Sequence, residues 1–121
     1  METNIRNKCK AYTSLEQSKK LAEILPIESA DMEYIFIKKD NVPVGKVPFV
    51  KDDSEVENSG FSFVYNRISC WSLAALLGVL PNSTDICKNI EGRYYVHGFF
   101  SDNPVDACVD AIKALHELNL L

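Results

Sequence analysis

A cysteine and a histidine are the side chains of this sequence best suited to nucleophilic catalysis. Cys70 precedes Trp71 at the expected start of an apolar helix, and His97 follows within a β-rich run. A helix N-terminus and an imidazolium both stabilise a thiolate. Asp102 or Asn103 is placed to orient the histidine. Together these residues define a possible thiol-dependent hydrolase.

The Cys70-Trp71 pair resembles the nucleophile region of papain-like cysteine peptidases, although only over a few residues. The spacing from Cys70 to His97 is much shorter than in those enzymes, and no oxyanion donor, such as a glutamine shortly before the cysteine, can be identified. Free cysteine is among the most buried residue types. A core cysteine is therefore favoured, and the hydrolase is the alternative hypothesis.

The run YYVHGFF is apolar on both of its faces when it is taken as one strand. Tyr94, Val96 and Phe100 then point one way, and Tyr95 and Phe99 point the other way. Strands that are apolar on both faces need cover on both. Helices can supply this cover, or a second copy of the chain can, so the pattern predicts a protein-binding surface and a homodimer.

Other aromatic residues leave two interpretations open. Trp71 is large enough to anchor either a core or an interface. Alternatively, Tyr65, Trp71, Tyr94 and Phe99 line a pocket for a small ligand between the helices and the sheet.

The leucines of SCWSLAALLGVLP form an LxxLL pattern. Leu73, Leu76 and Leu77 fall on one side of a helix, as in short segments that dock into grooves of partner proteins. Any helix that faces a core needs the same spacing. Because this helix belongs to a compact domain and ends at Pro81, we expect the three leucines to belong to the core.

The order of elements favours an α+β fold with a mainly antiparallel sheet of about four to five strands packed with three helices, in the order αβββαββα. The first helix is expected to start at a capping box of Thr13 and Glu16. The helices are expected at residues 14–25, 70–80 and 104–118, strands at 32–38 and 61–66, an edge strand or loop at 42–50, and a hairpin around Glu91-Gly92.

Composition and charge restrict the class of protein. The chain has 121 residues, of which 46% are hydrophobic, and this suits one domain over residues 13–121 after a partly disordered tail at 1–12. A net charge of −4 gives no electrostatic reason to bind nucleic acid. No apolar run is long enough to span a membrane, and the scattered cysteines suggest neither a metal site nor disulfides, so we expect a cytoplasmic protein without cofactors.

Three segments, SLEQSKKLAEILPIESADM, CWSLAALLGVLP and DNPVDACVDAIKALHEL, resemble a group of small uncharacterised proteins of Bacteroidota that are often associated with prophages or mobile elements. The resemblance implies a bacterial or phage setting. It brings no catalytic residue or cofactor. The sequence as a whole favours a small non-enzymatic protein that acts through protein–protein interaction or self-association, as an accessory factor of a mobile element.

Overall fold

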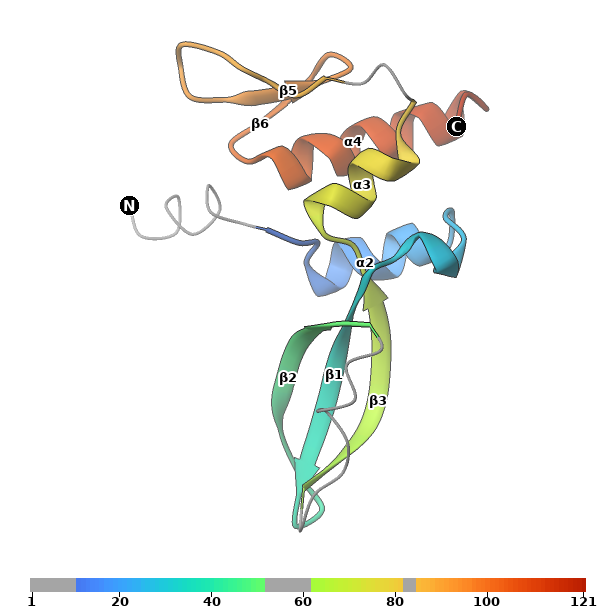
Figure 1. Ribbon diagram of the computed structural model, residues 1–121, viewed down its shortest axis with the longest axis vertical. Helices are drawn as coiled ribbons and strands as arrows, with labels where there is room; N and C mark the ends of the chain where they lie inside the picture. Colours follow the sequence, from blue (N-terminus) through green and yellow to red (C-terminus); the bar gives the residue numbers. More distant parts are fainter. Residues whose placement is uncertain (1–10, 52–61, 82–84) are drawn as a thin grey trace.

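The fold consists of a helical body and a projecting arm of β-strands (Figure 1). The computed structural model describes residues 11–51, 62–81 and 85–121, and it confirms the α+β class and the expected order of elements. The strands form two three-stranded antiparallel sheets, in the orders β2-β1-β3 and β4-β5-β6, where the sequence suggested one sheet. The division arises because α3 follows β3 and packs on α4, which carries the chain away from the first sheet.

The three expected helices are present, and the first two are shorter than expected. They are α2 (Leu15–Ala22), α3 (Leu73–Val79) and α4 (Pro104–Glu117), with a 3₁₀ helix, η1 (Ile27–Ser29), after α2. The capping box of α2 uses Ser14 and Gln17, one residue later than expected. The Ser14 hydroxyl accepts a hydrogen bond from the Gln17 backbone amide at 3.1 Å, and the Gln17 side chain accepts one from the Ser14 amide at 3.0 Å.

Because Ser14 caps α2, the polar groups of Thr13 are available to link the start of α2 to the residues just before α3. Its backbone amide donates to the Trp71 carbonyl at 2.9 Å, and its hydroxyl accepts from the Trp71 amide at 3.1 Å. The Thr13 carbonyl accepts from the Tyr34 hydroxyl at 2.7 Å. The Ser18 hydroxyl uses its hydrogen to donate to the Ser14 carbonyl. In the 2.8 Å contact between the two hydroxyl groups, the Thr13 hydroxyl is therefore the donor and the Ser18 hydroxyl the acceptor. We call these bonds the Thr13–Trp71 junction.

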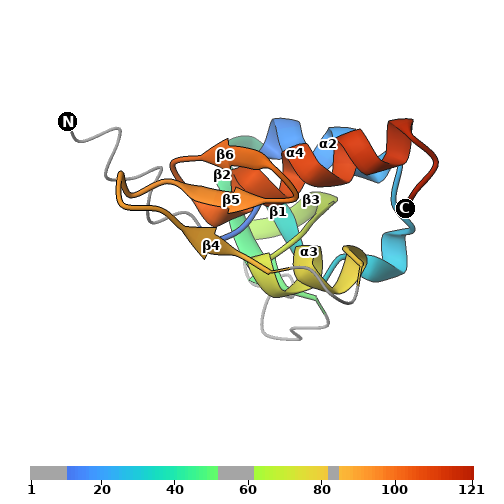
Figure 2. The ribbon, with the colours of Figure 1, turned by 90° about the horizontal axis from the view of Figure 1, so that it is seen from above.

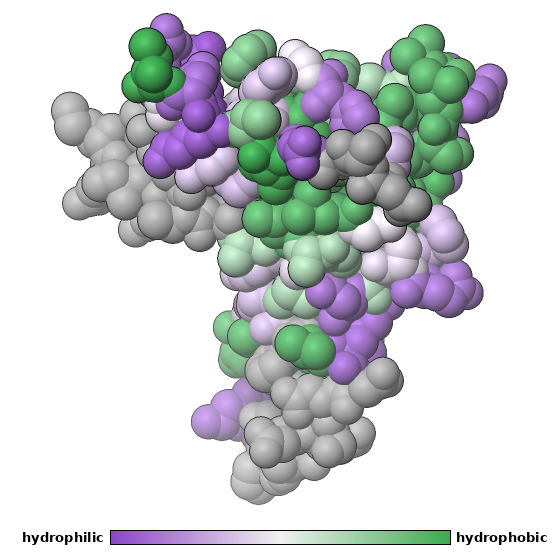
Figure 3. Space-filling view, turned by 45° about the horizontal axis from the view of Figure 1, so that its top comes forward, coloured by the Kyte–Doolittle hydropathy of each residue, from purple (hydrophilic) through white to green (hydrophobic). Residues whose placement is uncertain are grey.

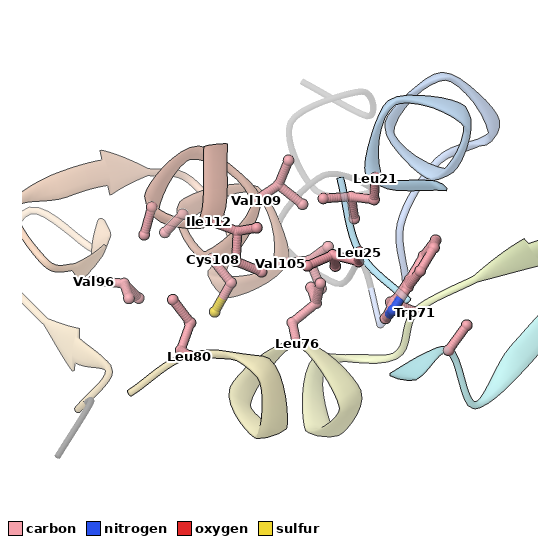
Figure 4. Packing of buried hydrophobic residues seen from close by; sticks show 13 residues of the cluster. Leu21, Leu25, Trp71, Leu76, Leu80, Val96, Val105, Cys108, Val109 and Ile112 are labelled. Atoms are coloured by element: carbon pink, nitrogen blue, oxygen red, sulfur yellow. The ribbon is translucent and has the colours of Figure 1, made fainter. Parts of the chain in front are cut away.

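One hydrophobic core fills the body (Figure 4). Trp71 and Leu76 are fully buried, and so is Ile112 of α4. The indole nitrogen of Trp71 donates to the Ser29 hydroxyl at 2.9 Å, so its polar atom is satisfied. Helix α4 contacts α2, α3, β5 and β6, and it is therefore the centre of the body (Figure 2).

The arm is a sheet of β1 (Met32–Lys39), β2 (Val42–Val50) and β3 (Ser62–Cys70), with β1 in the middle. Asp40 and Asn41 join β1 to β2, and both have positive φ, 53° and 66°, which suits a two-residue hairpin turn. Pro43 and Pro48 suit the edge position of β2, because proline has no backbone N–H to donate to a second neighbouring strand.

The expectation that YYVHGFF forms one strand with two apolar faces is wrong. The run is a hairpin rather than one strand, because His97 and Gly98 turn the chain with φ values of 49° and 85°. The sheet contains β4 (Cys87–Lys88), β5 (Tyr94–Val96) and β6 (Phe99–Ser101). Tyr95 therefore pairs with Phe100, and Val96 pairs with Phe99 and is buried.

Replacing Thr13 tests the junction. Thr13→Val keeps the shape of the side chain but leaves the buried Trp71 amide without its side-chain acceptor, so we expect the free energy of unfolding to fall by about 1–3 kcal/mol. Thr13→Ser keeps the hydroxyl and should lose less. Urea denaturation measures both, and a Thr13→Val protein as stable as the wild type would contradict the role of the junction.

Candidate protein-binding surface

Helix α3 begins where its first turn is capped by polar groups. The Ser72 hydroxyl accepts from the Ala75 amide at 3.2 Å. The Asp31 carboxylate in turn accepts hydrogen bonds from both the amide and the hydroxyl of Ser72. An extended Leu80 and then Pro81 end the helix. The cap therefore fixes the start of α3 to the residue before β1 and sets which side of the helix faces solvent.

The body of α3 has no polar side chain. Its sequence is LAALLGV, and only Leu76 is fully buried, against the core. The outward side consists of exposed Ala74 and Gly78, and it is flanked by Leu73 and Leu77, which are half-buried because they also pack against the core. We call these four residues the α3 surface. A helix that is apolar all round is normally buried on all sides, so this surface lacks a partner in the described chain.

A groove adjoins the α3 surface where the ends of the helices meet. Its volume is about 360 Å³. It is lined by Ile24, Leu25, Pro26, Ser29, Gly78, Val79, His116 and Leu121. We call it the C-terminal groove. Figure 3 shows hydrophobic side chains over α3 and at the C-terminal end of the body.

The end of α4 folds back to form one wall of this groove. Asn119 takes a left-handed conformation with a φ of 57°, and its amide donates to the His116 carbonyl at 3.0 Å. The Leu120 amide donates to the Leu115 carbonyl at 2.9 Å. Such a turn satisfies the last helical carbonyls and reverses the chain. It places Leu121 beside α3.

Charged residues border the groove on the side of α2 and α4. A neighbouring hollow of about 300 Å³ shares Ile24 and His116 with the groove. Its other lining residues are Lys20, Glu23, Lys113 and Glu117. The border therefore carries charges of both signs, while the α3 surface carries none.

The edge strand β2 is a less suitable binding surface, although it exposes valines. Val42 and Val44 are each 59% exposed. A partner strand would need backbone donors from the open edge of β2. Because Pro43 and Pro48 cannot donate, they interrupt such pairing, as in edge strands protected from aggregation.

The structure places Cys70 at the end of β3, not at a helix N-terminus as expected. The helix starts after Ser72, because Ser72 rather than Cys70 provides the cap. The Cys70 side chain is fully buried, and burial raises the pKa of its thiol to about 12, with a further contribution from the Asp31 carboxylate. A nucleophilic thiol needs the opposite shift. The geometry supports a core role for Cys70.

The other residues of the hypothetical hydrolase have separate positions. His97 is exposed in the turn of the β5–β6 hairpin, on a different sheet from Cys70 (Figure 1). Asp102 is exposed, whereas Asn103 is buried and caps α4 by accepting from the Asp106 amide at 2.8 Å. The Asn103 side chain also donates to the Asp106 carboxylate at 2.8 Å. Its role as the N-cap of α4 explains why Asn103 is buried at this position.

The aromatic candidates are not brought together. Trp71 is part of the core, which rules out the interface position that the sequence left open. Tyr65 lies on the arm, 42% exposed, with the Lys38 ammonium 4.7 Å from its ring centroid. Tyr94 and Phe99 lie on the other sheet, so these residues do not line one pocket. Tyr95 is exposed and stacks on its cross-strand partner.

The sequence pattern predicted that Leu73, Leu76 and Leu77 belong to the core, and this is confirmed, because Leu76 is fully buried and Leu73 and Leu77 pack against the core. The exposed side of the helix was missed. The signal was present, because Leu73–Val79 contains no polar residue with which to form a solvated face. The groove was not predictable, since it combines residues that are far apart in the sequence.

The described ranges contain no cluster of three or more metal-ligating side chains and no helix long and apolar enough to cross a membrane. Comparisons with known proteins found no matching family model, curated protein or solved structure. The resemblance to small Bacteroidota proteins therefore stays a prediction.

Alkylation of the folded protein tests the assignment of the thiols. In a Cys9→Ser background we expect exposed Cys87 to react readily, and buried Cys70 and Cys108 to react only after unfolding, because burial raises both pKa values, to about 12 and about 11. Mass spectrometry of digested samples identifies the modified cysteines, with urea-unfolded protein as the control. Faster labelling of Cys70 than of Cys87 in the folded protein would instead support a reactive nucleophile.

Proposed function

We propose that this chain is a non-enzymatic binding protein that recognises another protein, or a second copy of itself, through the α3 surface. The observation that carries the proposal is the apolar character of α3 on its exposed as well as its buried side. Contiguous apolar surface on a soluble domain marks interaction sites, since its burial is favourable by roughly 25 cal/mol per Å².

The distribution of charge supports the same function. Interface cores are depleted in charged residues and are surrounded by polar rims. The α3 surface is uncharged, while the Asp31 carboxylate lies at the N-terminal cap of the helix and charged side chains such as Lys20 and Glu117 border the adjoining groove. This pattern is typical of a protein-binding surface.

Two features support a binding function rather than an enzymatic one. The buried Cys70 thiol and the exposed His97 lie on different sheets, so the hypothetical nucleophile and base do not form a site. The C-terminal groove is lined mainly by aliphatic side chains, and Ser29, its only hydroxyl-bearing residue, already accepts from Trp71 and donates to the Pro26 carbonyl.

The setting belongs to the proposal as well. A bacterial or phage cytoplasm, and an accessory role for a mobile element, follow from the resemblance of the three sequence segments. In that setting the protein would act by binding, without cofactor, nucleic acid or membrane.

Site-specific photo-crosslinking in bacterial cells tests the function. With p-benzoylphenylalanine in place of Ala74, we expect discrete crosslinked adducts, because the side chain is exposed at the centre of the α3 surface. The same probe in place of exposed Lys19 on α2 is the matched control. Adding Gly78→Glu should abolish the adducts of the Ala74 probe. Equal crosslinking from both positions, or none from Ala74, would overturn the proposal.

A further inference from the structure

We infer that the α3 surface is the contact between two copies of this chain, related by a two-fold axis that passes close to Gly78. The inference rests on the proposed function and specifies the partner. A two-fold contact uses the same patch on both copies, so the patch must be complementary to itself.

Gly78 gives the first argument, because nothing within the described chain requires a glycine there. Gly45, Gly92 and Gly98 have positive φ values, which explain their presence. Gly78 is helical, and a Cβ at its position would meet no atom within 4 Å. Glycine inside a helix is less favourable than alanine by about 1 kcal/mol. Close approach by a second backbone explains why no side chain stands at this position.

The shape of the surface gives the second argument. The α3 surface is the convex side of a helix, and the C-terminal groove beside it is concave. Gly78 belongs to both features. Rotation by 180° about an axis near Gly78 lays the convex part of one copy, with Ala74 and Leu77, on the concave part of the other. Each copy thus fills the groove of its partner.

The charges around the groove give the third argument. Lys20 and Lys113 lie together in the bordering hollow, and Glu23 and Glu117 lie one turn further along the same two helices. An antiparallel arrangement of two copies can bring lysines of one copy towards glutamates of the other. If the charges around the groove all had the same sign, they would repel a second copy and favour a different partner of opposite charge.

The size of the patch also matters. A stable interface buries roughly 800 Å² on each partner, whereas a helix of seven residues is only about 10 Å long. The contact therefore has to include the flanks of α3. Ile27 on one flank is 52% exposed, and Leu121 in the groove is 44% exposed. These side chains extend the apolar area beyond the helix itself.

Sedimentation velocity of the full chain over a range of concentrations tests the inference. We expect a monomer–dimer equilibrium for the wild type and a monomer at all concentrations for Gly78→Leu, whose side chain occupies the axis. Because the space before Gly78 is open and leucine is the better helix former, the melting temperature of dilute Gly78→Leu should equal or exceed that of the wild type. Ala22→Leu, an exposed substitution on α2, is the control and should still dimerise.

The outcomes separate the inference from the proposed function. A wild-type chain that stays monomeric overturns the two-fold contact, and so does a Gly78→Leu protein that dimerises like the wild type. If the wild type is monomeric but the Ala74 probe still forms an adduct with a different protein, the proposed function stands and only the choice of partner fails. If Gly78→Leu unfolds, Gly78→Ala provides the second test, with an expected weakening of dimerisation in a folded protein.

Discussion

The Thr13–Trp71 junction is the constraint on which the rest of this structure depends. Thr13 holds both backbone groups of Trp71 while its carbonyl accepts from the Tyr34 hydroxyl, so one buried residue ties the arm to the body. Trp71 is thereby fixed in the core, directly before the cap of α3. The direction in which α3 leaves the sheet, and hence the side of α3 that faces solvent, follows from this arrangement.

Local signals predicted most of the fold. Apolar periodicity and Pro104 predicted α4 within a residue or two. The capping box was displaced by one residue because Ser14, like Thr13, can cap a helix, and only the long-range bonds of Thr13 decide between them. The division into two sheets depends on packing between distant elements, which no local pattern records.

The candidate site was less accessible to sequence reasoning than the fold. Cysteine, histidine and aromatic residues drew attention because they can do chemistry, yet Cys70 and Trp71 are buried for the sake of packing. The residues that now define the α3 surface are small or aliphatic. Their importance comes from exposure, which the sequence expresses only as a helix without a polar face, and from a glycine that the described chain does not require.

The central claim is that α3 presents a surface that is covered by a second copy of the chain. Hydrogen–deuterium exchange measured at low and high protein concentration tests it most directly, because the amides of α3 and of the C-terminal turn exchange more slowly when they are covered. The account predicts greater protection at high concentration for residues 73–80 and 118–121, and no change in β2. Exchange in α3 that is independent of concentration, with β2 protected instead, would contradict it.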